Sequence, residues 1–136
     1  MSRTRPDDVI KISAHREVCI LDDNTFDTTG SSAELLSFMS VGYSRTTIFV
    51  KNIHGTDELT IDVEVAPYNS DGSEPTTQQW RKINTVDYPK ALAAGESDII
   101  NLIGVYGYIR VLGHDSSGGG GNNDHARIGV IMTRDG

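Results

Sequence analysis

The sequence predicts an all-β fold, an antiparallel sandwich of the jelly-roll or immunoglobulin-like kind with about eight or nine strands. Three observations support this prediction. Residues 59–66 alternate apolar and polar side chains, as a strand with one solvated face does. Clusters of Gly, Asp, Asn, Ser and Pro recur between short β-branched runs, as turns recur between strands. The chain also shows no convincing long helix and no internal repeat.

The length of 136 residues predicts one domain with a single core. We expect residues 1–8 to form a flexible N-terminal arm, because Met1 to Pro6 holds nothing apolar beyond the initiator and Pro6 cannot donate to a ladder. Residues 9–136 then form the β-sandwich domain.

The first elements of that domain are predicted to be two short strands, Val9–Ile12 and Val18–Leu21, paired as an outer hairpin. The acidic cluster Asp22–Asn24 favours a turn after the second strand. Cys19 is the only cysteine, so no internal disulfide can form, and its apolar neighbours predict a buried structural thiol.

A loop at 27–32 leads to residues 33–41, where helix and strand compete. A cap at Ser32 and the spacing of Leu35 and Met39 suit a short helix, whereas the alternation through Phe38 suits a strand. We predict a strand, because the neighbouring segments are all strands. A turn at 42–44 follows.

The centre of the chain is predicted to be a β-hairpin. Thr46–Ile53 is a dense β-branched and aromatic run, Leu59–Ala66 alternates, and His54–Asp57 between them has the composition of a reversing turn. The remaining strands are expected at Trp80–Val86, Asp98–Ile103, Val105–Leu112 and Ala126–Met132, with a flexible polar loop at 116–124 before the last.

Composition argues against several function classes. The formal net charge of −7 opposes binding to nucleic acid or to an anionic membrane surface, both of which need clustered Lys and Arg. Neither a secretory signal nor a run of about 20 apolar residues is evident, so we expect cytoplasmic synthesis and no membrane partner.

Motifs for catalysis, metals and cofactors are weak, so we expect no enzyme, no metal and no cofactor. His15, His54, His114 and His125 are predicted to be exposed loop residues. Only His114-Asp115 and Asp124-His125, at the two ends of the glycine-rich loop, could converge as metal ligands. Residues 69–74 resemble the start of a calcium loop without its distal glutamate, and no nucleophile elbow is present.

The strand predicted at 105–112 carries the candidate interface. Tyr106, Tyr108 and Arg110 share one face of it, where they could cover a neighbouring subunit. The same tyrosines could instead pack at the sheet edge, or form with Trp80 a stacking platform for sugars. Arg3 and Arg5 in the arm are further candidate interface residues.

Several motifs in order give the chain a resemblance over roughly residues 46–134. They are Ile-Phe-Val-Lys-Asn (48–52), Leu-Thr-Ile-Asp-Val-Glu-Val (59–65), Asp-Gly (71–72), Trp80, Leu-Ala-Ala-Gly-Glu-Ser (92–97) and Tyr-Gly-Tyr-Ile-Arg-Val (106–111). In this order they resemble small β-sandwich proteins encoded among the virion genes of tailed phages and related viruses. The pattern is also similar to discoidin-like and other binding sandwiches.

The resemblance implies a structural virion protein, a capsid decoration or cement protein or another accessory protein that binds the assembled particle. It implies a homo-oligomer, with a trimer favoured, whose partner is the major capsid protein or another virion protein. The protein would be synthesised in the host cytoplasm and located in the virion. The alternative function is a carbohydrate- or cell-surface-binding β-sandwich module.

Overall fold

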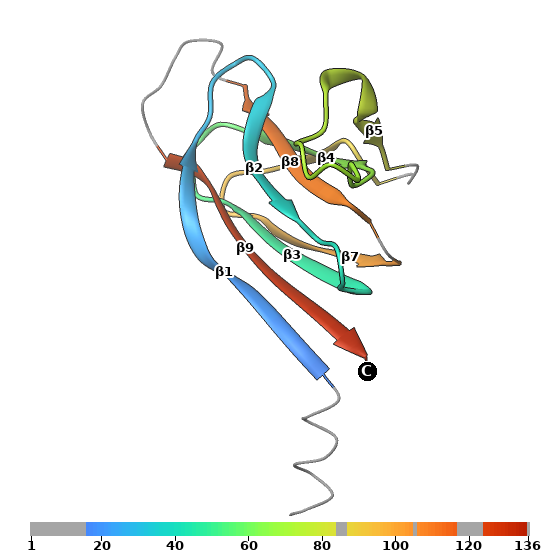
Figure 1. Cartoon of the computed structure of the whole chain (residues 1–136). Helices are drawn as coiled ribbons and strands as arrows, with labels where there is room; N and C mark the ends of the chain where they lie inside the picture. Colours follow the sequence, from blue (N-terminus) through green and yellow to red (C-terminus); the bar gives the residue numbers. More distant parts are fainter. Residues whose placement is uncertain (1–15, 84–86, 105, 117–123, 136) are drawn as a thin grey trace, which may run out of the picture.

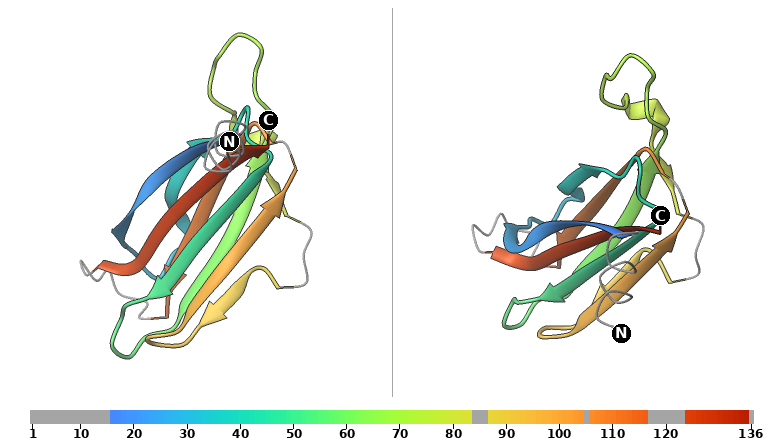
Figure 2. Two further views of the ribbon diagram at one scale, coloured as in Figure 1. Left: turned by 90° about the horizontal axis from the view of Figure 1, so that it is seen from below. Right: turned by 60° about the horizontal axis from the view of Figure 1, so that its bottom comes forward.

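The computed structural model, which describes residues 16–83, 87–104, 106–116 and 124–135, is an all-β sandwich of two antiparallel sheets (Figures 1 and 2). Sheet A has the order β1 (Arg16–Asp27), β9 (Asp124–Asp135), β3 (Arg45–Asn52) and β7 (Ser97–Ile103). Sheet B has the order β2 (Ala33–Met39), β8 (Tyr108–Asp115), β4 (Leu59–Ala66) and β5 (Arg81–Lys82), and β6 (Lys90–Leu92) also pairs with β4. A single 3₁₀ turn, η1 (Thr77–Gln79), precedes β5.

The topology selects the jelly roll from the two predicted sandwich types. With β5 set aside, the strand orders are β1-β9-β3-β7 and β2-β8-β4-β6, so the chain crosses from one sheet to the other at every connection except β4–β6. This is the eight-strand order of a jelly roll, which stacks two sheets face to face. The prediction of an all-β sandwich of eight or nine strands is therefore confirmed.

The predicted central hairpin is wrong, because β3 and β4 lie in different sheets. Both strands bury one face, and they bury it against each other across the sandwich. The connection is held by the buried Asn52, whose amide donates to the carbonyl of Asp57 (2.8 Å) and accepts from the backbone N–H of His54 (2.9 Å). The turn thus carries the chain between layers.

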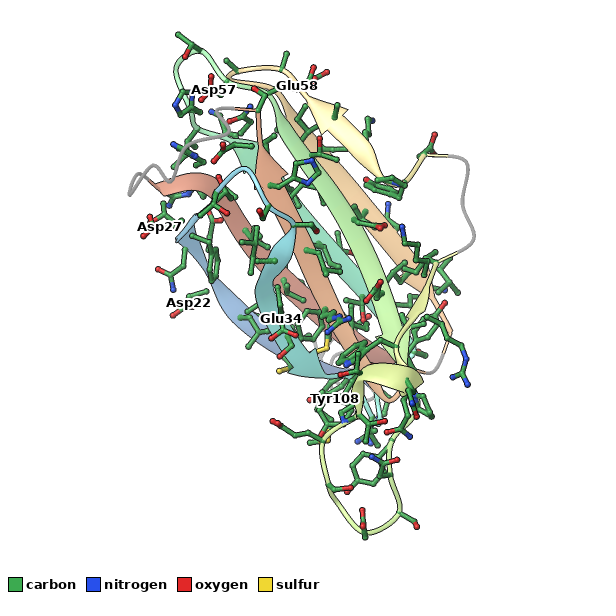
Figure 3. The ribbon with its side chains drawn as sticks, turned by 90° about the horizontal axis from the view of Figure 1, so that it is seen from above. Asp22, Asp27, Glu34, Asp57, Glu58 and Tyr108 are labelled. Atoms are coloured by element: carbon green, nitrogen blue, oxygen red, sulfur yellow. The ribbon has the colours of Figure 1, made fainter. Side chains whose placement is uncertain are left out.

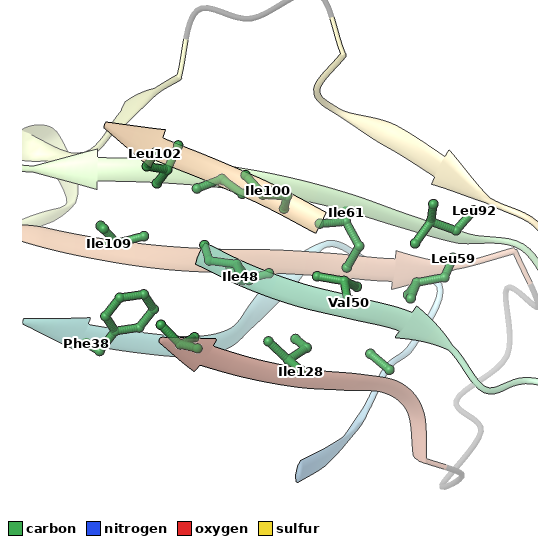
Figure 4. Close-up of a cluster of buried hydrophobic side chains, with 14 of the residues drawn as sticks. Phe38, Ile48, Val50, Leu59, Ile61, Leu92, Ile100, Leu102, Ile109 and Ile128 are labelled. Carbon is green, nitrogen blue, oxygen red and sulfur yellow. The ribbon is translucent and has the colours of Figure 1, made fainter. Parts of the chain in front are cut away.

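A continuous hydrophobic core lies between the sheets (Figure 4). Both layers contribute to it through alternate residues of each strand, as the period of two requires. Its most deeply buried members, at 1% exposure or less, are Ile48, Leu59, Ile61, Val63, Leu92, Ile109, Val111, Ala126, Ile128, Val130 and Met132.

Several local predictions can be compared with the structure. Residues 33–39 form strand β2, as predicted. The turn predicted at Asp22–Asn24 is wrong, because the extra residues form a bulge within a longer β1 that stays paired with β9. The predicted strand at 9–12, its hairpin and the arm at 1–8 lie outside the described residues. Cys19 is partly buried against the core.

The strand predicted at 105–112 begins three residues later, at Tyr108. Gly107 explains the late start, since a Cβ there would lie 2.1 Å from the backbone nitrogen of Tyr68. Only glycine permits this close approach of two chain segments. Of the run predicted at 80–86, β5 at Arg81–Lys82 is the described strand, and residues 84–86 lie outside the described ranges.

Candidate interaction surface

The outward side of sheet A exposes large apolar side chains from all four strands. The strand register arranges the outward residues in four rows, each crossing the sheet from β1 through β9 and β3 to β7. The first row is Val18, Thr133, Arg45 and Ile103, and the second is Ile20, Ile131, Thr47 and Asn101. The third is the β1 bulge, Gly129, Phe49 and Ile99, and the fourth is Thr25, Arg127, Lys51 and Ser97. Six of these side chains are large hydrophobics with exposures from 37% to 74%: Val18, Ile20, Phe49, Ile99, Ile103 and Ile131. We name this surface the sheet A face.

The sheet A face has a ridge and a hollow side by side at its centre. Phe49 on β3 lies directly beside Gly129 on β9, which has no side chain to match it. A depression of about 300 Å³ beside Gly129 is lined by Ile20, Asp23, Phe49 and Ile131, among others. The surface therefore has an exposed aromatic ring beside a depression, and Asp23 lies over the buried Gly129 within that depression.

Charge on this face is divided between its two sides. Asp22 and Asp23 lie at the β1 bulge, and Figure 3 shows Asp22 on the outer edge of β1. Asp23 accepts a hydrogen bond from Arg127 at 2.7 Å, but both partners are about half exposed. On β3, Lys51 makes no ion pair with any described residue. An acidic β1 edge thus lies across the sheet from a basic β3.

The outward side of sheet B is different, because its charges and aromatic rings are paired within the chain. Arg110 donates to Glu64 through Nε (2.8 Å), lies 3.5 Å from Glu34, and places its guanidinium 4.4 Å from the Trp80 ring centroid. Lys82 pairs with Asp62 at 3.2 Å. One strand's cation therefore serves carboxylates from two neighbouring strands.

The predicted interface residues lie on or near this ion-paired side. Tyr108 and Arg110 project from β8, and Tyr108 stacks against Tyr68 with centroids 6.3 Å apart. Tyr106 precedes the strand and packs partly buried against the core. Arg3 and Arg5 lie outside the described residues. The interface at these residues stays a prediction.

Sequence reasoning missed the sheet A face, although a signal for it was present. A solvated sandwich strand alternates apolar and polar residues, but the runs 18–21, 99–100 and 130–132 are apolar on both faces. Such runs indicate strands that are covered on both sides. The sheet topology decides which outer face stays uncovered, and the topology is known only from the structure.

The two sheets are tied together at the β7 rim of the sheet A face. Asp98 on β7 accepts hydrogen bonds from the Tyr88 hydroxyl (2.5 Å) and from Lys90 on β6 (3.1 Å). The Tyr88 hydrogen bond, aided by Lys90, holds the pKa of Asp98 below its ordinary value despite partial burial. Burial and the Asp98 carboxylate raise the pKa of Tyr88. These groups stabilise the sandwich.

A buried polar cluster closes the opposite rim. Asp115 at the end of β8 accepts a hydrogen bond from Thr28 (2.7 Å) and lies 2.8 Å from Nδ1 of His125. Nδ1 of His125 is also 2.7 Å from the Thr28 hydroxyl, and the His54 ring packs edge-on at 4.2 Å between centroids. The prediction of an exposed His125 is wrong: it occupies an inward position on β9 and is 1% exposed.

The contacts within this buried polar cluster link β8 to β9. Asp115 and His125 do converge, as the sequence allowed, and their contact joins the two strands that flank residues 117–123. Nδ1 faces both polar partners, and Nε2 has no hydrogen-bond partner among the described residues. Within the same described ranges no group of three His, Cys, Asp or Glu side chains is placed to hold a metal ion.

Oxygen atoms of residues 69–74, the segment that resembles the start of a calcium loop, accept hydrogen bonds from within the segment. Oδ1 of Asp71 accepts from the backbone and the hydroxyl of Ser73, which lowers the pKa of Asp71. Nδ2 of Asn69 donates to the carbonyls of Ser73 and Glu74. This is the internal bonding of a stable polar turn.

The helical part of the described chain, one short 3₁₀ turn, is far from a membrane-spanning length.

Comparison with known proteins gives structural matches alone. No family model matches the chain, and no curated protein matches it by sequence. The SPBc2 prophage-derived protein YomS is similar at 9% identity and a TM-score of 0.49, over 87% of this chain and 94% of that one. VP2 of the infectious bursal disease virus subviral particle is similar at 17% identity and a TM-score of 0.49, over 89% of this chain and 33% of that one.

A third match is the CBM22-1 xylan-binding domain of Paenibacillus barcinonensis Xyn10C, at 9% identity and a TM-score of 0.39, over 88% of this chain and 80% of that one. All three matches have TM-scores below 0.5. Because fold alone does not define function, the proposal below rests on this chain's own surfaces.

Proposed function

We propose that this chain is a structural virion protein, a capsid decoration or other accessory subunit that acts by binding protein surfaces. The observation that carries the proposal is the sheet A face, which exposes six large hydrophobic side chains, with Ile20 beside Ile131 and Phe49 beside Ile99 in register. Contiguous apolar patches of this kind on a small domain mark sites of protein association.

The acidic composition suits this proposal. With a net charge of −7 the chain repels nucleic acid and anionic surfaces at long range, whereas an apolar face binds through area removed from water. The proposal includes self-association and location in the virion. The trimer expected from the sequence would use the side of sheet B that carries Tyr108 and Arg110.

A carbohydrate-binding module is the second candidate, favoured by the exposed Tyr68 stacked on Tyr108. A sugar-stacking platform needs an open aromatic face. Arg110 occupies one face of Trp80, which leaves Tyr68 as the exposed ring of this group. A glycan array with the wild type and Tyr68→Ala separates the candidates, since binding lost in Tyr68→Ala would favour the carbohydrate module.

The proposed function is tested on particles from the source that encodes the chain, banded on a density gradient. We expect the wild-type chain to band with the particles at a fixed ratio to the major structural protein. We expect Phe49→Glu to remain in the soluble fraction, while the control Met39→Glu, changed at an exposed apolar residue of β2, still bands with the particles. A wild-type chain that never bands with particles would contradict the virion role.

A further inference from the structure

Fifteen residues precede Arg16, the first described residue of β1. Among them, Asp7 and Asp8 are followed by the run Val9-Ile10-Lys11-Ile12, the main apolar run of this part of the sequence. The even-numbered residues of 7–12 are in turn acidic, apolar and apolar, and an extended chain presents such alternate residues on one side. We name residues 7–12 the acidic–apolar segment.

The sheet A face has two cations side by side at the end away from the start of β1. Arg127 on β9 and Lys51 on β3 are register partners, and both are exposed on the outward side. Like charges directly opposite each other repel. Arg127 is bound by Asp23, whereas Lys51 makes no ion pair with any described residue. A further carboxylate at this place would relieve the repulsion.

The two cations border a depression of about 330 Å³ with an apolar wall of Phe49 and Ile99. Its two carboxylates, Asp23 and Asp98, are each bound by another cation of the chain. Lys51 is therefore the charged group that remains available to an incoming ligand. The depression suits a carboxylate that is followed closely by an apolar side chain.

The spacing of the acidic–apolar segment matches the spacing of the sheet A face. Along β9, Arg127 lies eight residues from Asp135, the register partner of Arg16, which is about 27 Å at 3.4 Å per residue. An extended chain of eight residues from Arg16 back to Asp8 covers the same length. The step up to an overlying layer uses part of this length, and Asp7, one residue further, makes up the difference. The carboxylates can therefore reach the cation pair.

The same count brings the apolar side chains of the segment over apolar rows of the face. Ile12 falls on the second row, which holds Ile20 and Ile131. Ile10 falls on the third row, which holds Phe49. Because the segment is tethered to β1, its effective concentration at the face is in the millimolar range, and a small contact area is enough to hold it.

The free edge of β1 is the other place that the tether allows, and it is the hairpin that the sequence alone predicts. A reversal of the chain near residues 13–16 would bring Asp7 and Asp8 beside Asp22 and Asp23 at the β1 bulge. Like charges on neighbouring strands repel. The six exposed hydrophobic side chains of the sheet A face would also stay in water. Charge and apolar pattern therefore both favour the face over the edge.

We infer that the acidic–apolar segment folds back over the sheet A face of its own chain, with Ile10 and Ile12 on the apolar rows and its carboxylates at Lys51 and Arg127. The free chain thereby covers the face that binds particles in the proposed function, and this regulatory consequence rests on that function. A particle surface must displace the segment before it can bind.

The test is cross-linking within the full chain in a Cys19→Ser background, which removes the single native thiol. Lys11→Cys marks the segment and leaves its acidic and apolar side chains unchanged. It is combined with Thr47→Cys on the second row of the sheet A face, or with Thr60→Cys, an equally half-buried outward position on β4 of sheet B. A bismaleimide spanning about 10 Å matches the spacing of packed β-layers. Mass spectrometry distinguishes links within one chain from links between chains.

We expect the Lys11→Cys/Thr47→Cys pair to link within one chain at least fivefold faster than the Lys11→Cys/Thr60→Cys pair. Lys51→Glu should slow the first link at least fivefold, and adding Asp8→Lys should restore the rate, which mere proximity of the tether would not do. Circular dichroism and thermal unfolding check that each variant folds. Equal rates for the two pairs, a rate that Lys51→Glu leaves unchanged, or links formed only between chains would overturn this inference.

Particle binding separates this inference from the proposed function. The Lys11→Cys/Thr47→Cys chain should band with particles before cross-linking and stay in the soluble fraction once the link is made. A locked chain that still bands would overturn the regulatory role of the segment. Failed cross-linking with normal banding would overturn this inference alone, whereas a wild-type chain that never bands with particles defeats the proposed function itself.

Discussion

The two outer faces of the sandwich differ in how their side chains are satisfied. On sheet B, Arg110 serves Glu64, Glu34 and the Trp80 ring, so charge and aromatic surface are completed within the chain. On sheet A, Phe49 and Ile99 stand adjacent in register and exposed, and the neighbouring Asp23–Arg127 pair is half solvated.

The difference shows which groups cover the side chains of each outer face. Trp80, which Arg110 contacts, and the Tyr68–Tyr108 stack lie on the sheet B side of the same polypeptide, and Figure 3 shows Tyr108 at the end where the 67–80 segment projects. No described segment does the same for the sheet A face. A partner chain can supply that cover, which is why the apolar face marks an association surface.

The largest expected effect compares one ion pair on each face. Arg110→Ala should lower the free energy of unfolding by about 2–3 kcal/mol, because it leaves the mostly buried Glu64 without its cation and uncovers Trp80. The control Arg127→Ala breaks an exposed pair and should cost less than about 1 kcal/mol. Urea unfolding at pH 7 measures both. Equal losses would show that the faces do not differ as described.

The next effect concerns the β7 rim. Asp98→Asn should cost about 1–2 kcal/mol at pH 7, because it replaces the charged acceptor of Tyr88 and Lys90. The pKa of Asp98 is held below the ordinary 3.8, so its contribution is present above that pH and is lost as the pH falls through the lowered value. The difference in unfolding free energy between wild type and Asp98→Asn should therefore be smaller at pH 2 than at pH 7. A gap of constant size would contradict this assignment.

A smaller effect is expected at Gly129, which lies beside Phe49 in register. Gly129→Ala should cost about 1 kcal/mol, since the new Cβ would lie 3.1 Å from Cβ of Asp23 and the β1 bulge must shift slightly. Gly55→Ala is the control, because its Cβ would meet nothing within 4 Å. Equal losses in Gly129→Ala and Gly55→Ala would argue against the close approach of Asp23 to Gly129.

The smallest effect on stability is expected on the exposed apolar face itself. Ile99→Ser should change the free energy of unfolding by no more than about 0.5 kcal/mol, because the side chain is already more than half exposed in the free chain. Its neighbour Ile100, buried in the core, is the contrast: Ile100→Ser should cost more than about 3 kcal/mol. Thermal unfolding of dilute protein checks the pair.

Much of the fold could be predicted from the sequence because alternation is local. Alternation indicates the strand at 59–66, and the preceding turn marks the run at 98–103. At 33–39 the spacing also fits a helix, and the neighbouring strands favour a strand. Alternation does not say which sheet a strand joins. For that reason β3 and β4 look like a hairpin in the sequence although they lie in opposite layers.

The site was less predictable, because exposure depends on what the rest of the chain covers. His125 resembles a loop residue in sequence, yet its partners Thr28 and Asp115 are 97 and 10 residues away and bury it. Phe49 and Ile99 resemble core residues in dense apolar runs, yet the fold leaves them on an outer face. Both cases depend on contacts that a local pattern does not contain.

The central claim is tested most directly by the affinity of the purified chain for particles from its source, measured by co-sedimentation over a wide range of chain concentrations. The account predicts saturable binding of the wild type, at least tenfold weaker binding of Phe49→Glu and of Ile99→Glu, and unchanged binding of Met39→Glu on sheet B. Association that is unaffected by the two sheet A variants, or is lost in Met39→Glu alone, would contradict it.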